Sequence, residues 1–145
     1  FERRQFAFEA MTSGLIAQMQ MSEFTLALLE STGWYVPDYS YADPFYWGKG
    51  KGCSFLTGAC SSSKYSEFCS TSSRGCVMTG RGGGSCSTDT RSDNCKWFHP
   101  NNNYDCDNDN GDNYARLPSL QAYGRSAGSK CFNGTLNTRS AGSST

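Results

Sequence analysis

Two runs decide the fold of this chain: Phe8-Glu9-Ala10-Met11-Thr12-Ser13-Gly14 and, after a spacer, Ser22-Glu23-Phe24-Thr25-Leu26-Ala27-Leu28-Leu29-Glu30-Ser31-Thr32-Gly33-Trp34. The second run predicts a helix from Ser22 to Thr32. Ser22 can cap it by accepting a bond from a free first-turn N–H, and Gly33 stands where a left-handed residue commonly ends a helix. Because the positions between these caps are apolar almost all round, we expect the helix to be buried on most faces by neighbours that need not all belong to this chain.

Composition and charge argue against several classes of protein. The chain has 145 residues, one domain's worth, and no net charge, so nothing favours binding to nucleic acid or to an anionic membrane surface. No apolar run reaches the roughly 18 residues that a transmembrane segment needs. No signal peptide is visible and the sequence starts at Phe1, so we expect an internal piece of a longer product.

Eight cysteines in Ser-, Gly-, Asn- and Tyr-rich sequence indicate an oxidising, extracellular setting. Asn133 begins an Asn-Gly-Thr acceptor for N-glycosylation, which agrees. A zinc site is not supported, because there is no Cys-x-x-Cys and the single histidine, His99, is interpreted as a surface turn residue. Few aliphatic residues follow Cys53, so we expect cross-links rather than a hydrophobic core to hold that region.

Aromatic residues dominate from Trp34 to Trp47, where Pro37 and Pro44 argue against a regular helix or a central strand. Such rings could line a sugar-binding surface, but covering a core is their commoner use. The three methionines of the 11–21 segment are likewise interpreted as core filling.

The spaced aspartates Asp105, Asp107 and Asp109 look superficially like a calcium loop. The EF-hand pattern fails, because Asn110 stands where its glycine belongs and Arg116 where its bidentate glutamate belongs. Nothing local supports a Ser-His-Asp site either.

Several ordered motifs resemble the leishmanolysin family of zinc metallopeptidases, in the style of its protist members. The motifs cover nearly the whole chain and are Met11-Thr12, Thr25-Leu26-Ala27-Leu28-Leu29-Glu30, Gly33-Trp34-Tyr35, Trp47-Gly48-Lys49-Gly50-Lys51-Gly52-Cys53-x-Phe55-Leu56 with Cys60, Asn94-Cys95, Cys106, and Ser129-Lys130-Cys131-Phe132-Asn133-Gly134-Thr135-Leu136.

The resemblance implies a metzincin, in which a His-Glu-x-x-His helix and a later third histidine bind zinc above a Met-turn. None of these ligands is in this sequence. The third ligand of the family lies just before a segment like Phe1-Glu2, so zinc would be bound upstream of Phe1 and this chain alone is predicted to be inactive. Met11 would be the Met-turn methionine, buried beside Phe8 as an apolar floor that does not bind the metal.

The implied fold class is α+β. Residues 1–52 would be the end of a metzincin catalytic subdomain, with the Met-turn, one buried helix and the aromatic connector. Residues 53–145 would be a disulfide-rich domain of leishmanolysin type, made of loops and short strands.

Eight cysteines allow 105 pairings, among which spacing does not choose. The resemblance implies that Cys53 bonds to a cysteine upstream of Phe1 and that Cys106 bonds to one downstream of Thr145. Within the chain it implies the pairs Cys60–Cys95, Cys69–Cys86 and Cys76–Cys131.

Two functions follow as expectations. In the first, the chain is the C-terminal fragment of a secreted or cell-surface zinc metalloendopeptidase, with the zinc-binding remainder of the protease, protein substrates and an N-glycan as partners. In the second, it is a non-catalytic, cysteine-rich extracellular module for structure or cell adhesion, derived from the protease fold. No nucleic acid and no transmembrane segment is expected in either.

Overall fold

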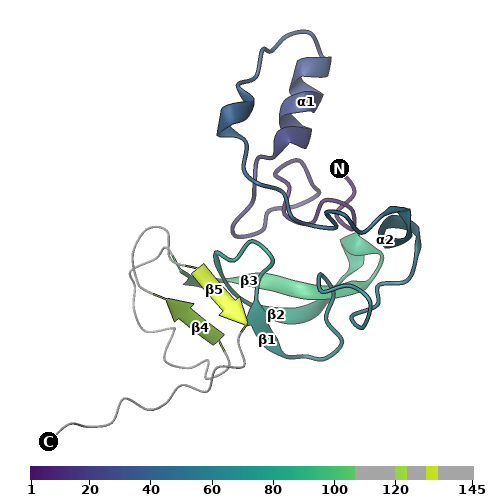
Figure 1. The fold of residues 1–145 in the computed structure, drawn as a ribbon, viewed down its shortest axis with the longest axis vertical. Helices are drawn as coiled ribbons and strands as arrows, with labels where there is room; N and C mark the ends of the chain where they lie inside the picture. The colour runs from purple at the N-terminus through teal and green to yellow at the C-terminus, as the bar shows by residue number, and fades with distance from the viewer. Residues whose placement is uncertain (107–119, 124–129, 134–145) are drawn as a thin grey trace, which may run out of the picture.

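A computed structural model describes residues 1–106, 120–123 and 130–133 of the chain. The elements are short and mixed (Figure 1), which confirms the α+β class. In chain order they are α1 (Glu23–Ser31), the 3-10 helix η1 (Tyr39–Tyr41), α2 (Cys53–Thr57), β1 (Arg74–Cys76), β2 (Gly82–Asp89), the 3-10 helix η2 (Thr90–Ser92), β3 (Cys95–Asp105), β4 (Leu120–Tyr123) and β5 (Lys130–Asn133).

The largest assembly is an antiparallel sheet in the order β1-β2-β3, and β4 and β5 form a separate antiparallel pair. Ser87 of β2 is opposite Trp97 of β3, and the register shifts between Gly82 and Gly84. Figure 1 shows α1 projecting away from the sheet, on the far side of the N-terminal loops.

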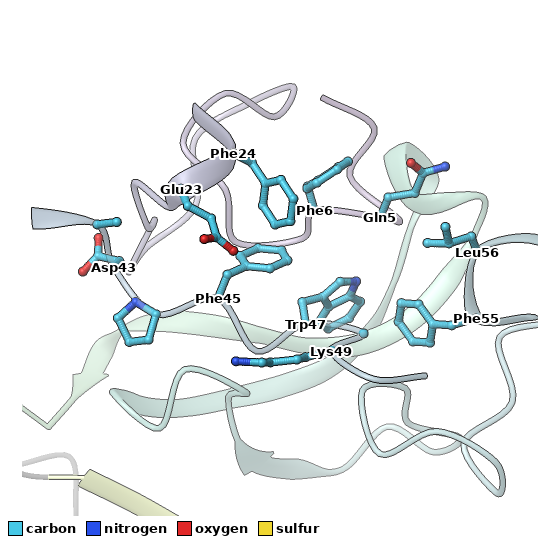
Figure 2. Close-up of a pocket in the computed structure, with 13 residues that line it drawn as sticks. Gln5, Phe6, Glu23, Phe24, Asp43, Phe45, Trp47, Lys49, Phe55 and Leu56 are labelled. Carbon is cyan, nitrogen blue, oxygen red and sulfur yellow. The ribbon is translucent and has the colours of Figure 1, made fainter. Parts of the chain in front are cut away.

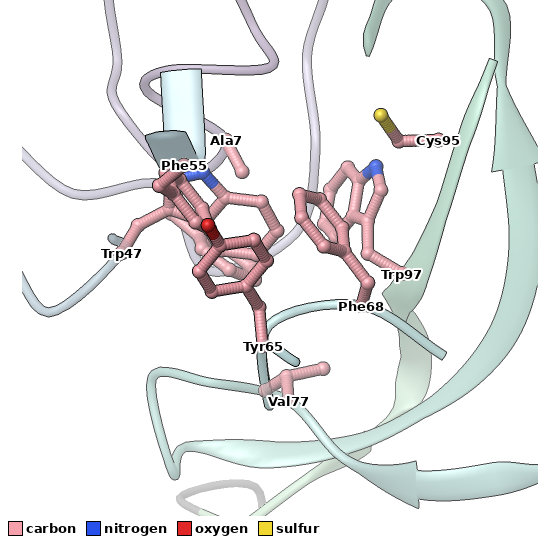
Figure 3. Packing of buried hydrophobic residues seen from close by; sticks show 9 residues of the cluster. Ala7, Trp47, Phe55, Tyr65, Phe68, Val77, Cys95 and Trp97 are labelled. Carbon is pink, nitrogen blue, oxygen red and sulfur yellow. The ribbon is translucent and has the colours of Figure 1, made fainter. Parts of the chain in front are cut away.

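One aromatic cluster forms the core, and both sides of the predicted boundary at residue 52 contribute to it (Figure 3). The ring of Trp97 lies 5.2 Å from that of Phe8 and 5.7 Å from that of Trp47, and Phe55 stacks on Phe68 at 5.3 Å. The expectation that no hydrophobic core holds the region after Cys53 is therefore wrong, because large rings replace the missing aliphatic side chains.

Helix α1 forms where its caps predict. The Ser22 hydroxyl accepts a hydrogen bond from Phe24 N, and Gly33 takes a φ of 74°, the left-handed conformation expected after a helix end. The expected burial is wrong within the described part of the chain: only Thr25 and Leu26 of α1 are buried, because the helix projects away from the sheet.

The aromatic connector contains no α-helix or strand, only η1. The core-covering interpretation is correct for Trp47, which is buried, but wrong for Trp34 and Tyr41, each 85% exposed. Core filling is also wrong for Met11 and Met21, each 48% exposed.

His99 is not a surface turn residue. It is half-buried within β3, opposite Ser85, and its ring lies 3.8 Å from that of Trp97. The strand continues through Pro100 because β3 is the edge strand of the three-stranded sheet, where a residue without N–H is tolerated.

Candidate functional site

The turn that carries Met11 is closed by short backbone hydrogen bonds. Ala10 N donates to Gln20 O at 2.8 Å, Gln20 N donates to Phe8 O at 2.7 Å, and Thr12 N donates to Glu9 O at 3.1 Å. Met11 therefore sits just beyond a fixed bridge between residues 9 and 20.

Met11 itself is 48% exposed, so the expectation that it is buried beside Phe8 and the helix is wrong for this chain. The two neighbours of the turn make those contacts instead. Phe8 packs against Trp97 in the aromatic cluster, and the carboxylate of Glu9 bonds to the start of α1. The Met11 side chain is thus left on the surface of a turn whose backbone is fixed.

Glu9 anchors the turn to α1. Its side chain is completely buried and accepts hydrogen bonds from Thr25 Oγ1 at 2.5 Å, from Ser22 N at 3.3 Å and from the Ser22 hydroxyl. A carboxylate at a helix N-terminus is stabilised by the free N–H groups and the helix dipole. Glu9 was not predicted as a site residue, and its one sequence signal is that an acid stands between the apolar residues Phe8 and Ala10.

Arg3 anchors the other side of the turn. Its Nη2 donates to the carbonyls of Ser13 at 2.5 Å and Gly14 at 2.6 Å, and its Nη1 lies 3.5 Å from Asp89 Oδ2 at the end of β2. Arg3 is 3% exposed and Asp89 is 7% exposed. The pair of Arg3 and Asp89 was not predicted either, because no local sequence pattern connects residues so far apart.

The environment of Asp89 favours its charged form. Burial raises the pKa of this carboxyl, but hydrogen bonds from Arg91 N and the Ser92 hydroxyl, with the charge of Arg3, outweigh burial and lower the pKa below its ordinary value. The pair with Arg3 is therefore ionic at neutral pH.

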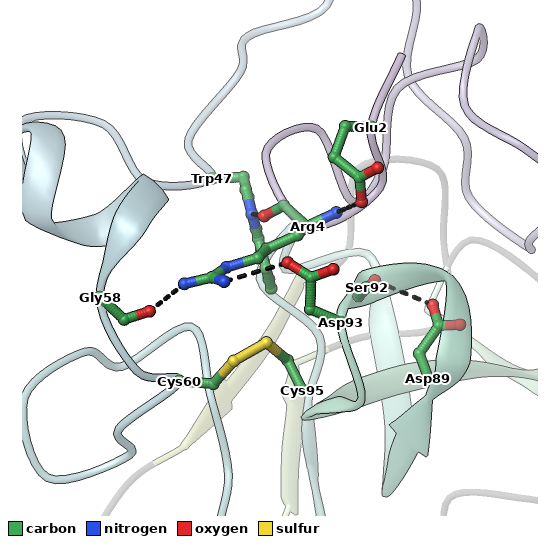
Figure 4. Close-up of a disulfide and its surroundings, with 9 residues drawn as sticks. All are labelled: Glu2, Arg4, Trp47, Gly58, Cys60, Asp89, Ser92, Asp93 and Cys95. Atoms are coloured by element: carbon green, nitrogen blue, oxygen red, sulfur yellow. Dashed lines mark hydrogen bonds and ion pairs between the residues drawn. A yellow bond between two sulfur atoms is a disulfide. The ribbon is translucent and has the colours of Figure 1, made fainter.

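Arg4 makes a parallel but more exposed link (Figure 4). Its Nη1 lies 3.0 Å from Asp93 Oδ2, its Nη2 donates to Gly58 O, and its own carbonyl accepts from Trp47 Nε1 at 2.8 Å. Asp93 is 61% exposed, so this ion pair contributes little to stability.

A groove of about 540 Å³ opens between α1 and α2 (Figure 2). Phe6, Phe24 and Phe45 lie against one another on one wall, with ring centroids 5.2 to 6.0 Å apart. Glu23 and Lys49 bring opposite charges to its lining. No sequence pattern predicted this groove, because its walls come from two helices and loops that are far apart in the sequence.

The described residues contain no group of three His, Cys, Asp or Glu side chains that could hold a metal ion. Burial lowers the pKa of His99, which favours the neutral ring, but His99 belongs to no such group of three. The zinc implied by the resemblance therefore has no site among residues 1–106, 120–123 and 130–133. Nor does this part of the chain contain a helix long and apolar enough to cross a membrane.

Three disulfides cross-link the chain, and they join the pairs that the resemblance implied: Cys60–Cys95, Cys69–Cys86 and Cys76–Cys131. Cys53 begins α2 as an exposed thiol, and Cys106 is buried at the end of β3. Asn133 ends β5. Asp107, Asp109, Asn110 and Arg116, named for the rejected calcium loop, lie outside the described residues.

Comparison with known proteins gives a consistent set of relatives. The sequence model of the family described as Leishmanolysin matches residues 1–94. The chain is 47% identical over 60 residues to a leishmanolysin-like peptidase of Drosophila pseudoobscura pseudoobscura, a match that covers 41% of this chain and 9% of the fly protein. It is 31% identical over 102 residues to the ciliated left-right organizer metallopeptidase of Danio rerio, covering 69% of this chain and 16% of the fish protein. The chain thus spans a small part of the length of these relatives.

Proposed function

We propose, because this chain belongs to the leishmanolysin family, that it supplies the Met-turn floor and the disulfide-rich domain of a secreted or cell-surface zinc metalloendopeptidase. Zinc in the complete enzyme would polarise the peptide carbonyl of a protein substrate and activate water. Its ligands would lie upstream of Phe1, so the chain by itself hydrolyses nothing. Residues 1–52 would belong to the catalytic subdomain and residues 53–145 to the C-terminal domain.

The single observation that carries this proposal is the held turn at Met11. Glu9 fastens one side of it to α1, and Arg3 fastens the other side to β2. Two buried charged side chains therefore fix the backbone of this turn. Such fixing is expected of a segment beneath a metal site, because small displacements near the reacting atoms lower the catalytic rate. The exposed Met11 thioether and the exposed face of α1 are the surfaces that the zinc-binding half would cover.

The test uses the complete protein that contains this chain. We expect one bound zinc per molecule, cleavage of a peptide substrate, and loss of cleavage on chelation that added zinc reverses. Met11→Gln should weaken zinc retention, because a polar group enters the apolar floor, while Met11→Leu should retain it. Met21→Gln is the matched control, since Met21 has the same 48% exposure.

A complete protein with neither zinc nor peptidase activity would contradict the proposal and leave the structural or adhesive module as the function. Equal zinc loss in Met11→Gln and Met21→Gln would contradict the Met-turn assignment alone.

The cross-links to the rest of the protein are part of the same proposal. Cys53 would bond to a cysteine upstream of Phe1 and Cys106 to one downstream of Thr145. The exposed Cys53 thiol should then react with iodoacetamide in this chain but not in the complete protein before reduction. Rapid alkylation of Cys53 in the complete, unreduced protein would refute that cross-link.

The disulfides and the glycosylation acceptor both concern the cellular location of the protein. The disulfides support an extracellular location. An N-glycan on Asn133 is proposed from the Asn-Gly-Thr acceptor alone, and enzymatic deglycosylation of the secreted protein should lower its mass.

A further inference from the structure

The two side chains that anchor the Met11 turn, Glu9 and Arg3, bind partners at very different distances along the chain. Glu9 binds residues 13 and 16 positions away, at the start of the helix that follows the turn. Arg3 binds Asp89, which is 86 positions away in the disulfide-linked sheet. The second anchor therefore connects two regions of the chain that no local interaction would bring together.

The geometry at Gly14 shows how tightly the second anchor fits. Gly14 has a φ of 91°, and a Cβ built on it would lie 2.7 Å from Arg91 Nη1 and 3.3 Å from Arg3 Nη2. Two guanidinium groups thus flank this backbone position, and one of them donates to the carbonyls of both Ser13 and Gly14. The positive φ favours glycine here, because a residue with a Cβ is strained in that conformation and its Cβ would also crowd the ends of both arginine side chains.

The far end of the anchor is equally fixed. Asp89 closes β2, and its carboxylate accepts from Arg91 N at 2.9 Å and from the Ser92 hydroxyl at 3.1 Å. The carboxylate is consequently held by η2 whether or not Arg3 is present. Arg3 meets this carboxylate through one nitrogen, Nη1, at 3.5 Å, while its Nη2 donates to the two carbonyls of the turn. A lysine ammonium on a flexible stem does not offer two separate nitrogens in one rigid plane.

We propose that Arg3 and Asp89 are positioning residues that set the turn of Met11 from the sheet of the disulfide-rich region. Both residues would act through the turn rather than by binding substrate or metal. Asp89 orients Arg3, and Arg3 orients the carbonyls of Ser13 and Gly14, and so the Met11 backbone. The inference rests on the proposed function, because it makes the sheet a determinant of the floor beneath the zinc site.

The experiment uses the complete protein with Arg3→Lys and Asp89→Asn, and Asp93→Asn as the matched control. Asp93 also pairs with an arginine of the N-terminal segment, but that arginine reaches Gly58 rather than the turn. Deuterium uptake of the peptide spanning residues 9–15 reports the turn, and kcat, KM and zinc content report the site. Asp89→Glu, which keeps the charge, tests for partial rescue.

We expect Arg3→Lys and Asp89→Asn to speed exchange at Thr12 N, whose bond to Glu9 O closes the turn, while exchange in β2 and β3 stays unchanged. We expect kcat to fall about 10- to 100-fold at constant zinc content, with KM within about twofold, because a displacement of about 1 Å far from the chemistry is enough for such losses. Asp93→Asn should match the wild type, and Asp89→Glu should recover part of kcat.

The inference is overturned if turn exchange is unchanged in both variants, if kcat per bound zinc is unchanged, or if Asp93→Asn loses as much kcat as Asp89→Asn. A wild-type protein without zinc or activity would instead contradict the proposed function. In that case the exchange measurement alone decides whether Arg3 and Asp89 hold the turn.

Discussion

Glu9→Ala should be among the most damaging single substitutions in this chain. Glu9 is completely buried, and truncation leaves Ser22 N, the Ser22 hydroxyl and the Thr25 hydroxyl without their acceptor. Each buried donor left unsatisfied costs about 1–3 kcal/mol. The Ser22 hydroxyl keeps the bond that it accepts from Phe24 N, so the cap of α1 itself is retained. We therefore expect the free energy of unfolding to fall by about 3–5 kcal/mol.

The assay is urea unfolding of the disulfide-intact chain, followed by both circular dichroism and tryptophan fluorescence. Glu30→Ala is the matched control, since Glu30 is an exposed residue of α1 whose side chain accepts a hydrogen bond from the Tyr39 hydroxyl. Its loss should cost less than about 0.5 kcal/mol. The reasoning is refuted if Glu9→Ala lowers the free energy of unfolding by no more than Glu30→Ala does.

Three further perturbations have defined outcomes. Replacing both Cys76 and Cys131 by alanine opens a 55-residue loop and should cost about 4 kcal/mol, measured by urea unfolding. Gly84→Ala should destabilise the sheet by about 1–3 kcal/mol or more, measured by thermal unfolding, because its Cβ would lie 2.4 Å from His99 O. Acid should also destabilise the chain through Asp89: its pKa is lowered from an ordinary 3.8, so the folded state binds fewer protons and the free energy of unfolding falls as the pH drops through that range. Asp89→Asn should flatten this acid dependence.

Each of these has a control and a contrary result. Removing the Cys69–Cys86 bond, whose loop spans only 17 residues, should cost about 1 kcal/mol less than removing Cys76–Cys131, and the opposite order would contradict the loop argument. Ser87→Ala, at an exposed position of β2, should leave the stability unchanged. An equal loss of stability in Ser87→Ala and Gly84→Ala would contradict the argument from the close contact at Gly84. An unchanged acid profile in Asp89→Asn would mean that other carboxyls dominate the titration.

Local chemistry made α1 predictable. Its two ends depend on a serine that caps the first turn and a glycine that takes a positive φ, and both effects act within a few residues. The strands were not predictable in the same way. β2 begins Gly82-Gly83-Gly84 and has no alternation of apolar and polar residues, so its place is set by pairing with β3 and by the Cys69–Cys86 bond.

The burial of the side chains that anchor the Met11 turn could not be predicted from local sequence. Arg3 and Glu9 look like ordinary surface charges in the sequence, and only their distant partners explain their burial. The family resemblance indicated Met11 but not what holds its turn. Conversely, the apolarity of α1 predicted that the helix is buried, whereas Phe24 and Leu28 remain 40% exposed. An apolar helix surface indicates that it can be buried, but it does not identify the residues that would cover it.

The link from Arg3 to Asp89 also has a consequence during synthesis. Its partners are 86 residues apart, so at about 5–20 residues per second the ribosome needs roughly 4 to 17 seconds to deliver Asp89 after Arg3. Throughout that interval Phe8 has no Trp97 to pack against, and the nascent segment must stay soluble with its apolar residues uncovered. The contact between Arg3 and Asp89 is therefore expected to form late, only after the end of β2 has been made.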